Sequence, residues 1–251
     1  MNNITISLVI PCYNEELNIQ KGVLDKIGNF TKDDNRFAEI LIIDDGSDDK
    51  SKDVIKNKYL SLFTKFRLIE NNHQGKAFAI IDGIRKSKSQ YVMFSDFDLA
   101  TPIEESEKLI RAIDPQTPII IGSRNKDRKD APIFRKIMSY GSVLVKSLLL
   151  GLRGINDTQC GFKLFDRTIA INLINALKVF HTNKRVSGPS VSAGFDIEFL
   201  FVAAKKGYKI TEISVDWKYA ETRRVNFVKD TFESLRDILL IKYYDLAKKY
   251  N

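Results

Sequence analysis

The chain has 251 residues, of which 43% are hydrophobic and 29% charged, and its formal net charge is +8 at pH 7. This balance is typical of a folded globular protein and excludes a disordered chain. The excess of Lys and Arg favours anionic partners such as phosphates, nucleic acid or an acidic membrane, although general solubility explains it equally well. No uncharged apolar stretch approaches the roughly 20 residues that span a bilayer, and the N-terminus lacks a secretory leader. Cys12 and Cys160 have no metal-ligand spacing, which suits a reducing compartment.

The first half of the chain alternates short apolar runs with segments of helical periodicity. The apolar runs predict strands at Ile4–Pro11, Glu39–Asp44, Phe66–Ile69, Tyr91–Ser95 and Pro118–Gly122, with a last strand at Tyr208–Trp217. The segments between them predict helices at Glu15–Phe30, Ser51–Leu60, Lys76–Ser87 and Ile103–Ile113. This alternation predicts an α/β fold with a mainly parallel central sheet and helices on both faces.

The C-terminal stretch Asn226–Tyr250 predicts one long amphipathic helix, because its apolar residues recur at helical spacing. We therefore divide the chain into a main domain at residues 1–225 and a C-terminal helix at 226–251. That helix could associate with a membrane, or its aromatic positions could be plain core. Thr182–Gly194 is the one long loop that the sequence predicts.

Polar clusters follow each of the first strands. They are Pro11–Glu16 (PCYNEE), Asp44–Asp49 (DDGSDD), Asn71–Lys76 (NNHQGK) and the triplet Asp96–Asp98 (DFD). Because parallel sheets bind ligands beyond the carboxyl ends of their strands, the clusters should converge on one edge.

Asp96 and Asp98 flank Phe97 directly after an apolar run, so both carboxylates could lie on one face while Phe97 points into the protein. Two hard oxygen ligands at a strand end suit Mg²⁺ or Mn²⁺, with waters and diphosphate oxygens completing the coordination. An isolated DxD is nevertheless more often an Asp-rich turn.

Two other clusters have features suited to a nucleotide. A carboxylate at Asp44 or Asp45 could accept the imide N–H of uracil, and Lys76, at a helix start after Gly75, could bind a phosphate. Each has a commoner structural explanation when taken alone. His73 and His181 are too far apart in sequence to suggest a metal pair, and we expect both to be structural or peripheral.

Taken together, the clusters resemble glycosyltransferase family 2, in which PxYNE, DDGS, a Gly-Lys pair and DxD occur in this order on a Rossmann-like GT-A fold. The resemblance implies that Pro11, Tyr13 and Glu15 border the nucleoside and that Asp45, alone or with Asp44, reads uracil. It further implies that Lys76 approaches the diphosphate and that Asp96 and Asp98 hold ribose, metal and diphosphate. Ala77 stands where the family usually has a further Gly.

The segment Asp157–Phe165, DTQCGFKLF, resembles a signature of polyprenyl- and dolichyl-phosphate sugar transferases, especially the glucosyl ones. The resemblance implies that Asp157 and Gln159 lie near the transferred sugar and that Lys163 forms a pair inside the protein. Residues 121–124, 194–198 and 215–217 also resemble family segments. The chain departs from the family at the loop Thr182–Gly194 and at Glu221–Arg224, where Arg223 and Arg224 replace the usual Gly-Ser-Lys.

The resemblance implies an inverting transfer of a hexose, with glucose favoured, from a UDP-sugar to a polyprenyl or dolichyl phosphate, with Mg²⁺ or Mn²⁺ as cofactor. The candidate catalytic residues are Asp98, Asp157 and Asp196, and the metal ligands Asp96 and Asp98. The candidate nucleotide-sugar ligands are Pro11, Tyr13, Glu15, Asp44, Asp45, Lys76, Asp96, Arg124 and Gln159. The candidate ligands of the acceptor phosphate are Arg124, Arg135, Arg223 and Arg224. If the acceptor were a sugar hydroxyl, Asp196 would be the candidate general base.

Six cations between Arg124 and Lys136, followed by an apolar run to Leu152, could lie against an anionic membrane, with a solvated helix face as an equal alternative. We therefore expect a cytoplasmic protein in peripheral contact with the cytoplasmic membrane face, and no nucleic-acid partner. Two alternatives remain. One is a soluble family 2 enzyme acting on a polysaccharide or protein glycan, and the other is a catalytically silent sugar-nucleotide-binding scaffold, which predicts lost metal ligands.

Overall fold

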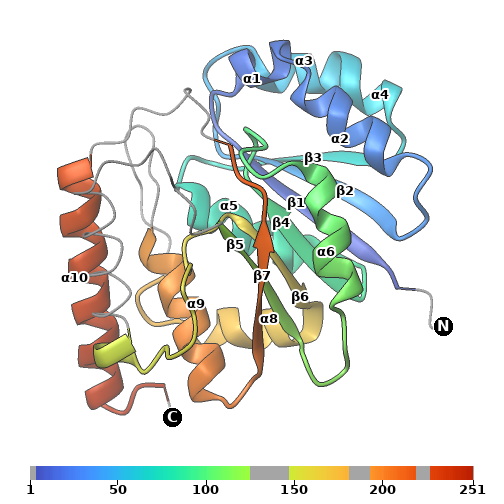
Figure 1. Cartoon of the computed structure of the whole chain (residues 1–251). Helices are drawn as coiled ribbons and strands as arrows, with labels where there is room; N and C mark the ends of the chain where they lie inside the picture. The colour runs from blue at the N-terminus through green and yellow to red at the C-terminus, as the bar shows by residue number, and fades with distance from the viewer. Residues whose placement is uncertain (1–3, 125–146, 181–192, 219–226, 251) are drawn as a thin grey trace.

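One mixed sheet forms the centre of the molecule (Figure 1). The structure is a computed structural model that describes residues 4–124, 147–180, 193–218 and 227–250, and at 193 and 227–231 it describes the backbone alone. The strands are β1 Ile6–Cys12, β2 Phe37–Asp44, β3 Phe66–Glu70, β4 Tyr91–Ser95, β5 Ile119–Arg124, β6 Phe162–Asp166 and β7 Ile210–Val215. Their order across the sheet is β3-β2-β1-β4-β6-β5-β7.

Strand β6 runs opposite to its neighbours. It pairs antiparallel with both β4 and β5, whereas β1 with β2, β1 with β4, β2 with β3 and β5 with β7 are parallel. The predicted mainly parallel sheet is therefore confirmed. Because Phe162 at the start of β6 pairs with Ser95 at the end of β4, the residues that precede β6 lie at the carboxyl edge of the parallel strands.

Helices cover both faces of the sheet. One face packs against α1 Glu16–Gln20, α2 Val23–Thr31, the helical segment Ser51–Leu62 (α3, η1, α4), η2 Ile103–Glu105 and α6 Ser106–Arg111. The other packs against α5 Lys76–Lys86, α8 Arg167–Ala176, α9 Ala193–Lys205 and α10 Phe227–Leu246. Alternate strand residues serve the two cores, since Leu8 and Ile10 belong to the first and Val9 to the second.

Three predicted helices differ from the expected single elements, and one of them, Ile103–Ile113, begins with the 3-10 helix η2 before α6. Glu15–Phe30 is divided into α1 and α2 at Gly22, whose φ of 78° lies in the left-handed region that glycine adopts without a Cβ penalty. Ser51–Leu62 changes to a π-helix over Ile55–Tyr59, which turns both Ile55 and Tyr59 into the core. The spacing of apolar residues in the sequence indicates which face of a helix is buried. It does not indicate where a helix is interrupted or changes its pitch.

The C-terminal helix α10 packs against α9 at one side of the molecule (Figure 1). Ile238 and Ile241 are buried in the shared core, and beyond the helix Lys248 takes a φ of 54°, so that the chain turns and Tyr250 is buried again. Within the described residues, no helix is both long enough and apolar enough to cross a membrane.

Candidate functional site

The loops after β1 and β2 are hydrogen-bonded to each other. The backbone N–H of Asn14 donates to Ser47 Oγ at 3.0 Å, and that of Glu15 donates to Ser51 Oγ at 2.8 Å. Asn14 adopts a φ of 54°, a conformation that Asn tolerates better than most residues, and its Oδ1 accepts from the N–H of Asp48. The PCYNEE and DDGSDD segments therefore form one rigid rim at the carboxyl edge of the sheet.

Asp45 lies beneath this rim and accepts three hydrogen bonds. Its Oδ1 accepts from the N–H of Gln74 at 2.9 Å, and its Oδ2 accepts from the N–H of Gly75 and from His73 Nδ1, both at 2.8 Å. Burial raises the pKa of Asp45 above its ordinary value, and the hydrogen bonds from Gln74 and Gly75 oppose that rise. The ring of Tyr13 stacks on His73 with centroids 4.0 Å apart.

Asp44 is also buried, but its hydrogen bonding is incomplete. Its Oδ2 accepts from the N–H of Ser47 at 3.3 Å, while no group of the described residues donates to its Oδ1. A buried carboxylate oxygen without a donor is unfavourable, so this position suits a ligand that supplies an N–H or O–H.

Lys76 and Asp96 form an ion pair between the start of α5 and the end of β4. Gly75, whose φ is 94°, precedes the helix, and the first N–H groups of α5 follow it. A helix N-terminus with an adjacent ammonium group favours an anion such as a diphosphate.

The Asp96–Asp98 triplet forms a tight turn after β4. Phe97 is buried in the core, as the sequence predicted, and Asp96 and Asp98 are half-buried. Leu99 takes a left-handed φ of 48°, and Asp98 Oδ1 accepts from the N–H of Ala100 at 3.0 Å. A Cβ on Gly161, the residue before β6, would overlap the carboxylate of Asp96, so any side chain there would force that carboxylate to shift.

The donor set at this turn fits a hard divalent cation in part. Asp96 and Asp98 supply carboxylate oxygens, which Mg²⁺ and Mn²⁺ prefer. No group of three metal-ligating side chains occurs within the residues that the structure describes. Since Mg²⁺ usually keeps several waters and binds substrate phosphates, two carboxylates are an adequate protein contribution.

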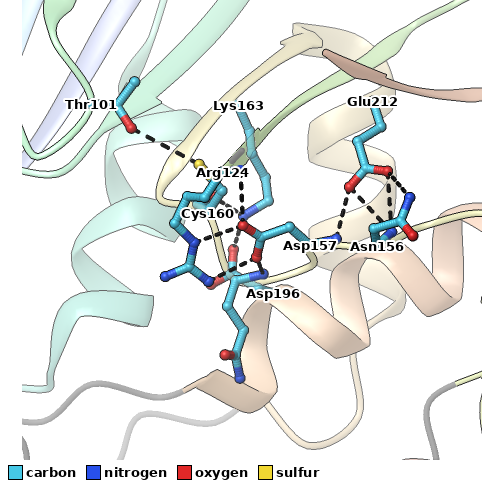
Figure 2. Close-up of polar contacts among 9 residues, drawn as sticks. Thr101, Arg124, Asn156, Asp157, Cys160, Lys163, Asp196 and Glu212 are labelled. Carbon is cyan, nitrogen blue, oxygen red and sulfur yellow. Dashed lines mark hydrogen bonds and ion pairs between the residues drawn. The ribbon is translucent and has the colours of Figure 1, made fainter. Parts of the chain in front are cut away.

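Arg124 and Asp157 form a bidentate pair (Figure 2). Arg124 Nε lies 2.6 Å from Asp157 Oδ2, and Nη2 lies 2.8 Å from Oδ1. Burial acts to raise the pKa of Asp157, but the Arg124 guanidinium outweighs it and holds that pKa below its ordinary value. The guanidinium also lies over the ring of Trp217, 5.7 Å from its centroid.

Glu212 on β7 fixes the segment that contains Asp157. Its carboxylate accepts from the N–H groups of Asn156 and Asp157, the latter at 2.7 Å, and from the Asn156 side chain at 2.8 Å (Figure 2). The segment before β6 is thus held from both β5 and β7.

Lys163 forms the predicted internal pair. Its side chain is 1% exposed, and Nζ donates to Asp196 Oδ1 at 2.5 Å and to the carbonyl of Cys160 at 2.6 Å (Figure 2). The ammonium also lies 5.0 Å from the centroid of the Phe94 ring. Burial, together with Asp157, raises the pKa of the Cys160 thiol to about 11, so this cysteine stays neutral.

Glu198, two residues after Asp196, has a different set of partners. Its buried carboxylate accepts from the N–H groups of Lys178, Val179 and Phe180 and from the hydroxyl of Tyr250 at 2.6 Å. Burial first, and then Glu198, raises the pKa of Tyr250. Glu198 therefore connects α9, the chain after α8 and the residues after α10.

The structure brings most of the candidate residues to one edge and leaves some outside its description. Gln159 is exposed, Tyr13 and Glu15 are half-buried, and Pro11 is buried in β1. Arg135, Arg223 and Arg224 lie outside the described residues, as do the basic segment after Arg124 and most of the Thr182–Gly194 loop. The acceptor-phosphate assignment is therefore described only at Arg124.

Sequence reasoning missed the contacts that His73 and Glu212 make with Asp45 and Asp157, and it missed the structural role of Glu198. We expected His73 to be structural or peripheral, whereas it contacts both Tyr13 and Asp45. Its position in the NNHQGK cluster after β3 was the available signal. Glu212 lies within a strand, and only the three-dimensional pairing of β5 with β7 brings it to Asp157.

Comparison with protein families agrees with this geometry. Residues 7–174 match the model of glycosyl transferase family 2, and the chain belongs to that family.

Among curated relatives, the chain is 36% identical over 227 residues to dolichyl-phosphate beta-glucosyltransferase ALG5A of Trichomonas vaginalis, a match that covers 86% of this chain and 66% of the relative. It is 30% identical to the dolichyl-phosphate beta-glucosyltransferases of Saccharomyces cerevisiae and Homo sapiens, covering 95% and 94% of this chain and 74% of each relative. The chain thus spans about two thirds to three quarters of these relatives.

Solved structures share the fold. Glucosyl-3-phosphoglycerate synthase from Mycobacterium tuberculosis in complex with UDP superposes with a TM-score of 0.67 at 17% identity, covering 95% of this chain and 80% of the other. The same synthase with Mn²⁺, UDP-glucose and phosphoglyceric acid gives a TM-score of 0.63 at the same coverage. The predicted GT-A fold and the predicted family are both confirmed.

Proposed function

We propose that this chain catalyses the inverting transfer of a hexose, with glucose favoured, from a UDP-sugar to a polyprenyl or dolichyl phosphate. The observation that carries the proposal is the alignment along one sheet edge of Asp45, the Lys76–Asp96 pair and the Arg124–Asp157 pair. In order, they suit a base, a diphosphate and a sugar with its acceptor. The names of the relatives, all dolichyl-phosphate beta-glucosyltransferases, support this acceptor class.

The donor nucleotide would lie across the ends of β1, β2 and β4. An ionised carboxylate offers about four acceptor positions, and the loop backbone uses two of those of Asp45 through Gln74 and Gly75, so Asp45 can accept an imide N–H of uracil. Tyr13 supplies an aromatic face for the base, and Pro11 and Glu15 border the nucleoside. Asp44 is the second candidate partner because its Oδ1 lacks a donor within the described residues.

The diphosphate would lie against Lys76 and the N-terminus of α5, with the ribose and a metal near Asp96 and Asp98. A divalent cation bound there would neutralise charge that develops on the departing UDP. Lys76 contributes a positive charge to the same oxygens, and its pairing with Asp96 holds the ammonium in position before the donor binds.

In the transfer itself, an oxygen of the acceptor phosphate forms a bond to the anomeric carbon as the bond from that carbon to the UDP oxygen breaks. The bonding pair leaves with UDP, and configuration inverts because the phosphate oxygen attacks the face opposite the leaving group. A phosphate monoester has its second pKa near ~6 and arrives largely ionised, so no general base is required. Asp157, with its lowered pKa, is a poor proton acceptor, and Asp196 accepts a hydrogen bond from Lys163. Both therefore act as positioning residues in this proposal.

Arg124 is suited to the acceptor phosphate. A guanidinium has five N–H donors, and its side chain uses two nitrogens on Asp157, which leaves N–H groups for an anion. Arg135, Arg223 and Arg224 remain proposed partners of the same phosphate.

A lipid acceptor requires contact with a membrane, and α10 offers a suitable surface. Phe232, Leu235, Leu239, Tyr243 and Leu246 are between 43% and 71% exposed and recur at helical spacing on one side of α10. On a helical projection Arg236 and Lys242 flank this stripe. An apolar stripe with cationic borders is typical of a helix lying in an anionic interface. We therefore assign residues 1–225 to catalysis and 226–251 to peripheral contact with the cytoplasmic membrane face.

The transfer is tested with radiolabelled UDP-glucose offered separately to polyprenyl phosphate and to oligosaccharides, with and without Mn²⁺. We expect organic-extractable label with the lipid phosphate only. Label confined to a water-soluble glycan would instead establish the alternative of a soluble family 2 enzyme. Calorimetric titration with UDP-glucose, GDP-mannose and UDP-N-acetylglucosamine would determine the base and sugar, and absence of all binding would contradict the proposal.

The membrane contact is tested by sedimentation with vesicles of anionic or zwitterionic phospholipid. The wild-type protein should sediment with the anionic vesicles, and the double variant Leu239→Ser/Tyr243→Ser should remain in the supernatant. Ala247→Ser is the matched control, since Ala247 is exposed directly after the end of α10 and lies outside the stripe. Equal sedimentation of all three proteins would rule out the stripe as the membrane surface.

A further inference from the structure

The imidazole of His73 lies between an aromatic ring and a carboxylate. On one side, the phenol ring of Tyr13 stacks on it with an interplanar angle of 12° and centroids 4.0 Å apart. On the other, Nδ1 lies 2.8 Å from Asp45 Oδ2 and 3.0 Å from the Asp45 carbonyl oxygen. Both oxygens are acceptors, so Nδ1 carries the proton and donates.

His73 covers the carboxylate that the proposed function assigns to uracil. The Asp45 side chain is only 3% exposed, although it stands at the ligand edge of the sheet. Two of its three donors, the N–H groups of Gln74 and Gly75, belong to the backbone of the loop and cannot leave without unfolding it. The third is a side chain, which can withdraw by rotation about its χ angles.

The two contacts of the imidazole are those that a uracil ring would make. Uracil is planar, has one imide N–H, and in this site would place its face against Tyr13 and its N–H on Asp45. We infer that His73 occupies the nucleobase position in the nucleotide-free protein, and that uridine binding displaces it. This inference rests on the proposed function, because it takes Tyr13 and Asp45 as the base-binding residues.

Displacement has two consequences for the site. When a side chain occupies the ligand position, only the fraction of protein molecules in which that position is empty can bind the nucleotide. The apparent dissociation constant of the nucleotide is therefore multiplied by the reciprocal of that fraction. Removal of the imidazole should therefore tighten nucleotide binding. Replacement of His73 also requires the incoming base to donate a hydrogen bond to Asp45. Cytosine presents an acceptor at its N3 and cannot replace His73 in this way, so CDP should bind more weakly than UDP.

The test is calorimetric titration of UDP and CDP, with Mg²⁺ present, into wild type, His73→Ala and the control Asn72→Ala. Asn72 is an exposed neighbour in the same loop and should leave both affinities unchanged. If the imidazole holds the position about nine-tenths of the time, His73→Ala should bind UDP roughly tenfold more tightly. In wild type, the His73 ring protons should lose the ring-current shift from Tyr13 when UDP is added, which NMR detects without any variant.

The outcomes separate the two proposals. Suppose that UDP binds wild type, binds His73→Ala equally or more weakly, and leaves the His73 ring-proton shifts unchanged. His73 would then remain in the pocket when the nucleotide binds, and this result would overturn the inference alone. No UDP binding to any of the three proteins would overturn the proposed function, and the inference with it.

Discussion

The Arg124 guanidinium faces the Asp157 carboxylate edge to edge, with N–O distances of 2.6 and 2.8 Å. The backbone N–H of Arg124 donates to the same carboxylate at 3.1 Å. The pair therefore joins the end of β5 to the segment that leads into β6, two points far apart in sequence.

Arg124→Lys should reduce activity because an ammonium group cannot form the bidentate contact. Loss of a hydrogen bond to a charged group corresponds to roughly 10–100-fold in kcat/KM if it acts in the transition state. Steady-state kinetics with UDP-glucose and a polyprenyl phosphate measure this. The UDP dissociation constant should stay within about twofold, since the base site is elsewhere. Arg153→Lys, at an exposed arginine, is the control, and wild-type kinetics in Arg124→Lys would contradict the assignment.

The Arg124–Asp157 pair should give a specific dependence of stability on pH. The pKa of Asp157 is lowered below 3.8, so its stabilising contribution is fully present above that pH and is lost as pH falls through the lowered folded value. We expect the difference in unfolding free energy between wild type and Asp157→Asn to shrink below pH 3.8. Chemical denaturation across this range measures it. In an Arg124→Met background the loss of this difference at low pH should no longer occur, because burial then raises the pKa of Asp157 and its carboxylate destabilises the fold at higher pH. A difference independent of pH in the wild-type background would refute the prediction.

Gly161→Ala should displace the carboxylate of Asp96, because the new Cβ would overlap it. We expect weaker Mn²⁺-dependent binding of UDP in calorimetry. Gly154→Ala controls for the loss of a glycine, since a Cβ there meets nothing within 4 Å and costs only the left-handed φ of 80°, about 1 kcal/mol. Equal UDP binding by both variants would argue against the close approach of β6 to the triplet.

Asp98→Ala should remove most of the metal-dependent activity, because Asp98 is one of two proposed carboxylate ligands. The observable is turnover as a function of Mn²⁺ concentration. Asp48→Ala, at an exposed aspartate on the neighbouring rim, should leave the metal dependence unchanged. Unaltered turnover in Asp98→Ala would overturn the metal assignment itself.

Tyr250→Phe should destabilise the protein by about 1 kcal/mol, because it removes one buried hydrogen bond to Glu198 while the ring stays against Phe201. Denaturant titration provides the measurement. Tyr243→Phe, at an exposed tyrosine of α10, should have no effect. Comparable stability of the two variants would show that the Tyr250 hydroxyl contributes nothing.

The sequence predicted the layers of the fold and the ligand edge, because both follow from local patterns. Apolar runs located six of the seven strands to within a few residues, whereas β6 was not among the predicted strands, and the clusters after β1, β2, β3 and β4 do converge. The direction of β6 was not predictable, since alternation of apolar residues is the same in either direction. The contact of Glu212 with Asp157 could not be predicted either, because the sequence does not indicate which strands become neighbours in the sheet.

The family signature gave Lys163 as half of an internal pair but left its partner open. Asp196 reaches it from α9, through a helix whose placement depends on the packing of α10. The left-handed Leu99 was also unexpected, since an aliphatic residue rarely adopts that conformation. Such strained backbone is often found beside functional groups, and here it follows Asp98 directly.

The pairing of Arg124 with Asp157 also bears on how this architecture can diversify. The pair joins the end of β5 to the residues before β6, and the described part of the chain between them, residues 147–156, places Leu150, Leu152 and Ile155 in the core. A segment exchanged here between relatives would therefore have to keep apolar residues at positions 150, 152 and 155.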